Sequence, residues 1–417
     1  MHKTLPVLLL GLLCQLATAF PDSAGRRLSS LADKGSSAGQ SVYLSHSTLR
    51  VLIWEELPQK YQAASAAELY GFATVGEPFS TEDSLWRSHW ADLDKHIISQ
   101  LHNSPLRVHS AELADVVFVP AVLDINKREA AEELLAQAER LFPLLKQKPH
   151  VIALNHPLTA YHHKWHGWLD LPIAKAFTFL VPEGWVYGWD HRFDNYVGMP
   201  FLSQVRWSRG RVHNAFDAQY YNRTKTLLAT ASFTTDKHEI RPRLQKHCTA
   251  APDLCAFVEP AADERQTAIR AFDGMKRAWH TMHAKDDYIT NAGVFESLTA
   301  TSLAVAFEAD FSRLLPFQDM IDWSKLVCYL PTQYAMPGDA NLLQTLQEKC
   351  DRNRYEKIEY LHGVRHVFQW SLNPRHELIS FSTKRTIHPE DDALTVTFKM
   401  LLKNLCARGL LSEKRCQ

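Results

Sequence analysis

Apolar and amphipathic stretches alternate along the chain from about residue 48 onward. The apolar runs at 50–57, 115–121 and 150–154 predict strands, and the run at 115–121 is apolar throughout, as strands buried on both faces are. Residues 80–104 and 128–145 carry apolar side chains at helical spacing and predict helices. The order strand, helix, strand, helix, strand predicts a parallel sheet with crossover helices.

A second alternating half follows a middle region, residues 157–215, which is rich in His and Trp and predicts loops and short strands. In that half we expect strands at 224–233, 302–307 and 326–330, helices near 262–283 and 291–301, and a closing helix at 393–409. The fold class is therefore α/β, with two Rossmann-like doubly wound domains facing a cleft. Ligands of such sheets bind beyond the carboxyl ends of the strands.

The N-terminus has a short basic start, an apolar stretch and the small-residue sequence Ala17-Thr18-Ala19. This pattern predicts a cleaved signal peptide at 1–19, with an uncleaved Golgi anchor as the alternative. Residues 20–45 are rich in Ser, Gly and Ala and predict a flexible stem. We expect an N-terminal domain at 46–215, a C-terminal domain at 216–385, and a closing helix and tail at 386–417.

The chain carries 46 basic and 46 acidic residues among its 417. This balance argues against a nucleic-acid partner, which would require a basic surface. A membrane partner is expected only if the N-terminal segment stays uncleaved.

Six cysteines remain after the expected cleavage, which suits an oxidising compartment. The sequence "CTAAPDLC" predicts a disulfide between Cys248 and Cys255, because Pro252 favours a turn between them. Cys328 lies in an apolar run, so it is either paired or a buried thiol. Asn222 is followed by Arg and Thr and is a candidate glycosylation site.

Four stretches resemble the exostosin-like glycosyltransferases, over roughly 48–405. The first ends in "ADVVFVP", and the second is "HVIALNHP". The third runs from 275 to 331 and ends in "LPFQDMIDWSKLVCYLP"; the fourth is "DDALTVTFKML". The resemblance implies the GT-B fold and an inverting transfer of a sugar, from a nucleotide sugar such as a UDP-sugar, to a glycan or glycoprotein acceptor. It also implies lumenal residence in the secretory pathway, at the Golgi or as a secreted protein, and no metal requirement.

The resemblance also suggests site residues. Glu296 lies where family members carry a carboxylate for the ribose, and Arg241 lies where they carry an arginine that could face the diphosphate. His156 follows a predicted strand at the cleft edge and is the candidate general base. For each of these residues the alternative is an ordinary structural or surface role.

The chain also departs from the family pattern. An arginine common three residues before the carboxylate is Gly293 here, and the Gly-Cys-x-Pro turn is "TSLA" at 301–304. Lys285 or His283 could replace the missing cation. These departures keep a second hypothesis open, in which a catalytically degenerate relative binds a glycan or a partner protein.

Two other sequence patterns have the residue types of metal sites. His163 and His166 are close enough in sequence to share a zinc ion, but they have no Cys pair or HExxH pattern beside them. The sequence "DLD" at 92–94 lies inside a predicted helix with alternating charge and is interpreted as a solvated helix face. We therefore expect no metal site.

Overall fold

The computed structural model describes residues 49–58, 61, 78–80, 85–86, 92–102, 104, 106–121, 123, 128–157, 160, 171–183, 194–207, 216–285, 290–309, 311–335, 341–371 and 392–416. Residues 46–417 form one compact unit. The predicted signal peptide and stem, and the histidines at 163 and 166, lie outside the described residues. None of the described helices combines the length and apolar character that a membrane-crossing helix requires.

The first sheet has six strands in the order β4-β1-β5-β6-β7-β8, and every neighbouring pair is parallel. Its strands are β1 (Val51–Ile53), β4 (Arg107–Val108), β5 (Val116–Phe118), β6 (His150–Ala153), β7 (Phe177–Val181) and β8 (Tyr196–Gly198). One face is covered by α3 (Leu93–His102) and α14 (Ala393–Ala407), the other by α4 (Arg128–Ala136) and α5 (Ala138–Leu141). The predicted helix over 128–145 is therefore two shorter helices.

The second sheet has five parallel strands in the order β11-β10-β12-β13-β14. They are β10 (Leu227–Ser232), β11 (Cys255–Val258), β12 (Ala278–His283), β13 (Leu303–Ala306) and β14 (Val327–Tyr329). One face packs on α8 (Ile240–Ala250) and α12 (Leu342–Lys349), the other on α9 (Glu264–Arg277), α10 (Ala292–Thr299) and α13 (Arg354–Val364). Two parallel α/β sheets of this kind form the GT-B fold.

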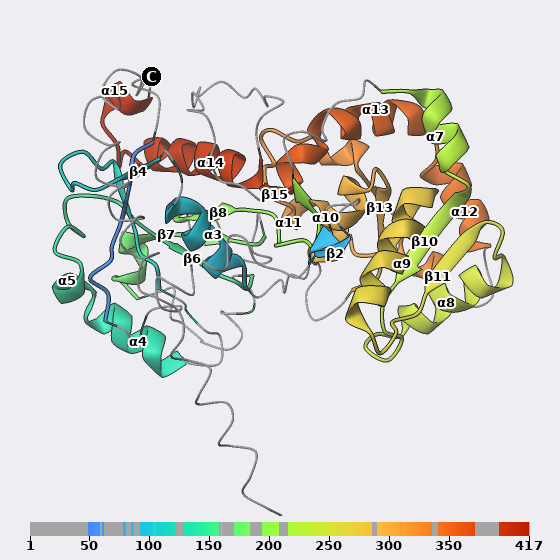
Figure 1. The fold of residues 1–417 in the computed structure, drawn as a ribbon, viewed down its shortest axis with the longest axis horizontal. Coiled ribbons are helices and arrows are strands. Elements are labelled where there is room, and N and C mark those ends of the chain that lie inside the picture. The colour runs from blue at the N-terminus through green and yellow to red at the C-terminus, as the bar shows by residue number, and fades with distance from the viewer. Residues whose placement is uncertain are drawn as a thin grey trace, which may run out of the picture. The chain divides into compact units, whose positions relative to one another are not determined.

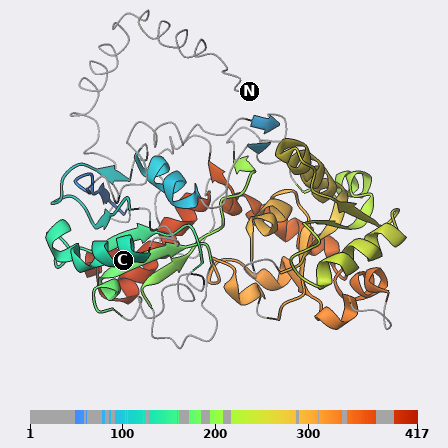
Figure 2. The same ribbon diagram turned by 90° about the horizontal axis from the view of Figure 1, so that it is seen from below.

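The closing helix α14 returns to the first half of the chain. Figure 1 shows α14 (red) beside β8 and the other strands of the first sheet, and Figure 2 shows the same pairing from below. Buried side chains of α14, among them Leu394, Phe398 and Leu402, join the core of the first sheet. The helix end is secured by a disulfide between Cys406 and Cys416.

Two sequence-based predictions of helices are wrong in part. In the stretch predicted as a helix over 80–104, Pro78–Ser80 (β2) and Leu85–Trp86 (β3) form a short antiparallel pair, and the described helix α3 covers Leu93–His102. The strand β2 lies against α9, so tertiary contact overrides the local helical pattern there. The expected helix at 262–283 ends at Arg277, and the rest is the buried strand β12.

The prediction for Asp94 is also wrong. Asp94, interpreted as part of a solvated face, is 0% exposed, and burial raises its pKa to about 7. Of the two alternatives for Cys328, the structure has the paired one, a disulfide with Cys350. The structure pairs Cys248 with Cys255, as the sequence favours.

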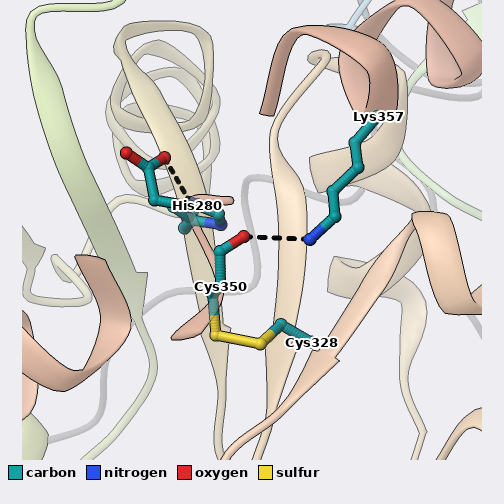
Figure 3. Close-up of a disulfide and its surroundings, with 5 residues drawn as sticks. His280, Cys328, Cys350 and Lys357 are labelled. Carbon is teal, nitrogen blue, oxygen red and sulfur yellow. Dashed lines mark hydrogen bonds and ion pairs between the residues drawn. A yellow bond between two sulfur atoms is a disulfide. The ribbon is translucent and has the colours of Figure 1, made fainter. Parts of the chain in front are cut away.

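The Cys328–Cys350 disulfide lies beside a group of charged side chains (Figure 3). His280 on β12 is fully buried, and its Nε2 lies 3.1 Å from Asp351 Oδ1. Lys357 Nζ donates to the backbone oxygen of Cys350 at 3.0 Å. The disulfide therefore ties the edge strand β14 to the chain segment whose Asp351 is hydrogen-bonded to the buried His280.

Residues 315–331 form a packed turn that leads into β14, the edge strand of the second sheet. Trp323 is 4% exposed, and its Nε1 donates to the backbone oxygen of Pro316 at 2.8 Å. The ring of Trp323 lies 5.2 Å from that of Phe368. The tryptophan thus anchors the turn into the core.

The backbone conformation at the end of α10 predicts which of two substitutions at Thr301 gives the more stable protein. Thr301 follows the helix with φ 60°, and the N–H of Ser302 donates to the oxygen of Ser297 at 2.8 Å, which is a left-handed helix cap. Glycine adopts this conformation without the steric cost that a Cβ adds. We expect Thr301→Gly to be about 1 kcal/mol more stable than Thr301→Ala in denaturant unfolding.

The matched control is Ala300→Gly, one residue earlier, where φ is −74°. Glycine should destabilise the protein at that position, because it gains nothing from the local conformation and loses backbone entropy. An alanine variant at 301 as stable as the glycine variant would contradict the prediction.

Candidate functional site

A cavity of about 520 Å³ opens at the carboxyl ends of β10 and β12, which is where parallel α/β sheets bind ligands. The volume falls in the range of small-molecule sites. The wall is completed by the start of α10 and by residues of α8 and α9. The lining residues used below are Phe201, Phe233, Lys237, Arg241, His283 and the segment 290–293.

Arg241 is held rigidly in this wall. Its side chain is 2% exposed; Nε donates to the backbone oxygen of Lys285 at 3.2 Å, and Nη1 donates to the backbone oxygen of Thr234 at 3.0 Å. The guanidinium also lies over the ring of Phe233, 5.3 Å from its centre. A permanently charged group is thus fixed at the cavity.

The cavity favours an anion. Lys237 and Arg241 are both in its wall, and no carboxylate is among its described lining residues. The first turn of α10 also faces it, since Asn291, Ala292 and Gly293 all line the cavity. The positive end of a helix dipole and its free N–H groups attract phosphate and other anions.

His283, one of the two candidates for a replacement cation, lines the cavity but stays neutral. Burial lowers its pKa to about 3. Ser297 Oγ donates to the backbone oxygen of Val294 at 2.7 Å, so the Nε2–H of His283, 3.1 Å away, donates to Ser297 Oγ. His283 therefore cannot supply the positive charge that Gly293 lacks.

Gly293 itself is tightly placed. A Cβ at this position would lie 3.1 Å from Asn291 Oδ1 and 3.8 Å from a ring carbon of His283. A side chain here would require a small shift of the Asn291 amide, so the packing fits glycine best.

The other sequence-derived candidates are not in the lining of the cavity. Lys285 contributes its backbone oxygen to Arg241, and its half-buried side chain is not in the wall. Glu296 lies one turn farther along α10, where its Oε1 accepts from the N–H of Gln204 at 3.0 Å. Asn222 is exposed on α7 (Ala218–Thr224) and accepts a hydrogen bond from the Tyr355 hydroxyl.

His156 lies three residues beyond β6, at the carboxyl edge of the first sheet. Its Nδ1 is 2.7 Å from Asn155 Oδ1. Because an amide oxygen only accepts hydrogen bonds, Nδ1 carries the proton and Nε2 keeps a basic lone pair. The ring is half-buried. This tautomer suits a general base.

Sequence reasoning missed Glu183, which follows β7 at the same edge. The side chain is 4% exposed, and burial raises its pKa to about 7. Its Oε1 accepts from Thr290 Oγ1 at 2.8 Å. The signal that could have found it is the apolar run "FTFLV" at 177–181, which ends in Pro182 and Glu183.

No metal centre accompanies these groups in the part of the chain that the structure describes. There, no three His, Cys, Asp or Glu side chains come together in a group that could hold a metal ion.

Comparison with known proteins identifies the family whose sequence model matches this chain. The sequence model of the exostosin GT47 domain matches residues 45–346. No curated protein sequence matches the chain.

Several solved structures resemble this one distantly. The calicheamicin glycosyltransferase CalG4 aligns with 12% identity and a TM-score of 0.33, over 76% of this chain and 93% of CalG4. HepE of Anabaena, in complex with UDP and glucose, aligns with 10% identity and a TM-score of 0.36, over 78% of this chain and 96% of HepE.

Proposed function

Because this chain belongs to the exostosin GT47 family of glycosyltransferases, we propose that it transfers a sugar from a UDP-sugar to a glycan or glycoprotein acceptor in the secretory pathway. The observation that carries the donor proposal is the cavity at the start of α10, with two cations and no carboxylate among its described lining residues. A nucleoside diphosphate sugar has the size and charge that this cavity suits.

The proposed reaction is a direct displacement with inversion at the anomeric carbon. The acceptor hydroxyl attacks that carbon, and the bond from the carbon to the diphosphate oxygen breaks. His156 Nε2 takes the hydroxyl proton, and the departing UDP carries away the electron pair. Arg241, Lys237 and the first turn of α10 stabilise the negative charge that develops on the diphosphate.

Glu296 is the proposed partner of the ribose hydroxyls. It lies on α10, one turn beyond the cavity-lining residues, and one carboxylate oxygen already accepts from Gln204. A carboxylate can accept hydrogen bonds from several donors at once, ribose hydroxyls included. Lys285 joins the donor site through its backbone oxygen, which fixes Arg241.

Localisation follows from the same family and from the N-terminal pattern. We propose a lumenal protein of the Golgi or a secreted one, with Asn222 as a glycosylation site. The exposure of Asn222 on α7 is compatible with a glycan.

The donor proposal predicts that Arg241→Met weakens UDP binding at least about tenfold, because it removes a buried charge from the cavity wall. Calorimetric titration with UDP, GDP and their sugars measures this. Arg243→Met is the matched control: it lies on the same helix, pairs with Glu239 and does not line the cavity. The same titration with Glu296→Ala tests the ribose contact.

A wild-type protein that binds no nucleotide or nucleotide sugar would overturn the donor proposal. Unchanged UDP affinity in Glu296→Ala would remove that residue from the site.

The alternative function, a degenerate relative that binds a glycan without catalysis, is favoured by one observation. The arginine that the family resemblance would place here is a glycine, Gly293, so the cavity wall lacks that positive charge. This alternative predicts glycan binding without release of UDP from any donor.

A further inference from the structure

Glu183 and Thr290 form a buried contact between distant parts of the chain. The Glu183 side chain is 4% exposed and the Thr290 side chain 1% exposed. The carboxylate accepts from both the hydroxyl and the backbone N–H of Thr290, the hydroxyl at 2.8 Å. Such doubled hydrogen bonds fix the position of the residue that donates them.

The two ends of this contact belong to the two sheets. Glu183 lies two residues beyond β7, at the carboxyl edge of the first sheet. Thr290 lines the cavity and immediately precedes Asn291, the N-cap residue of α10. The contact therefore secures the start of α10 to the first sheet.

A second contact secures the middle of the same helix. Glu296 accepts from the N–H of Gln204, which follows β8. Of the two contacts, only the one from Glu183 lies next to the first turn, whose residues Ala292 and Gly293 line the cavity. The position of the N–H groups of that turn decides how well they meet an anion, because hydrogen bonds weaken steeply with distance and angle.

We propose that Glu183 is a positioning residue for the donor: through Thr290 it holds the first turn of α10 where its N–H groups meet the donor diphosphate. This inference rests on the proposed function. The role is distinct from chemistry, since Glu183 acts on the nucleotide only through Thr290.

The direction in which UDP affinity changes when Glu183 is replaced distinguishes a positioning role from mere proximity to the diphosphate. An ionised carboxylate that merely lay near the diphosphate would repel it, so its removal would strengthen UDP binding. Removal of a positioning residue weakens UDP binding instead, because the first turn of α10 is released. Uridine lacks the diphosphate, so its affinity should not change.

Four variants test this. Glu183→Leu removes the acceptor and Thr290→Val removes the hydroxyl while preserving shape; Glu183→Gln and Thr290→Ser keep the hydrogen bond. We expect the first pair to weaken UDP binding about tenfold and the second pair by less than about threefold. Calorimetry measures UDP, ligand-observed NMR measures uridine, and thermal unfolding confirms that each variant is folded.

Two results would overturn the inference. One is unchanged or tighter UDP binding by Thr290→Val and Glu183→Leu. The other is a parallel loss of uridine and UDP affinity, which would indicate general damage to the cavity. Absence of UDP binding by the wild type would overturn the proposed function itself, and this inference with it.

Discussion

Replacing Cys328 and Cys350 together with alanine should lower the free energy of unfolding by about 3 kcal/mol. The disulfide spans 22 residues, and closing a loop of that length removes about this much conformational freedom from the unfolded chain. Cys350 is 0% exposed, and the next residue, Asp351, holds the buried His280. Denaturant unfolding under oxidising conditions measures the loss.

A local readout identifies the cause. The disulfide anchors β14, an edge strand of the second sheet, so its amides should exchange faster with solvent in the double variant. Removal of the Cys406–Cys416 disulfide is the control, because that bond lies at the end of α14 and should leave β14 unaffected. Equal stability of wild type and double variant would refute the prediction.

The second large expected effect is that the free energy of unfolding depends on pH through the titration of Glu183. Burial raises its pKa from 4.5 to about 7, so between these pH values the folded protein holds a proton that the unfolded chain has released. The stability contributed by this group is therefore full below pH 4.5 and is lost as pH rises through about 7. The linkage is worth up to about 3 kcal/mol.

Glu183→Gln isolates that contribution, since glutamine does not titrate. The variant should gain stability relative to the wild type between pH 5 and pH 8, as measured by denaturant unfolding at both values. The wild-type profile alone is insufficient, because burial also raises the pKa of Asp94 to about 7 and adds a dependence of the same sign. Parallel pH profiles for variant and wild type would show that Glu183 is not the source.

Several apolar runs located strands correctly, although the apolar run of β7 was not recognised as one. β5, β10 and β13 all lie within predicted runs. β12 was missed because its sequence, "AWHTMH", is half polar, yet all six residues are buried. Its polar side chains are satisfied by residues distant in sequence, since His280 meets Asp351, Thr281 meets Ser302 and His283 meets Ser297.

Only those residues of the candidate site that lie in a recognisable sequence motif could be predicted. The family resemblance pointed to Arg241, which the structure places in the cavity wall. It could not reveal the contact of Glu183 with Thr290, because the two residues are 107 positions apart and meet only through the fold. The roles of His156, Glu296 and Lys285 stay predictions, and binding measurements will decide them.

The return of α14 to the first sheet also bears on how such genes can be exchanged. The helix is encoded after the whole second sheet, yet its apolar face fills the core of the first. A single recombination event between two family members, anywhere between β8 and α14, would unite the first sheet of one parent with the closing helix of the other. Residues such as Phe398 and Leu402 must then fit a core with which they did not evolve. Viable chimaeras therefore require two crossovers, one on each side of the second sheet.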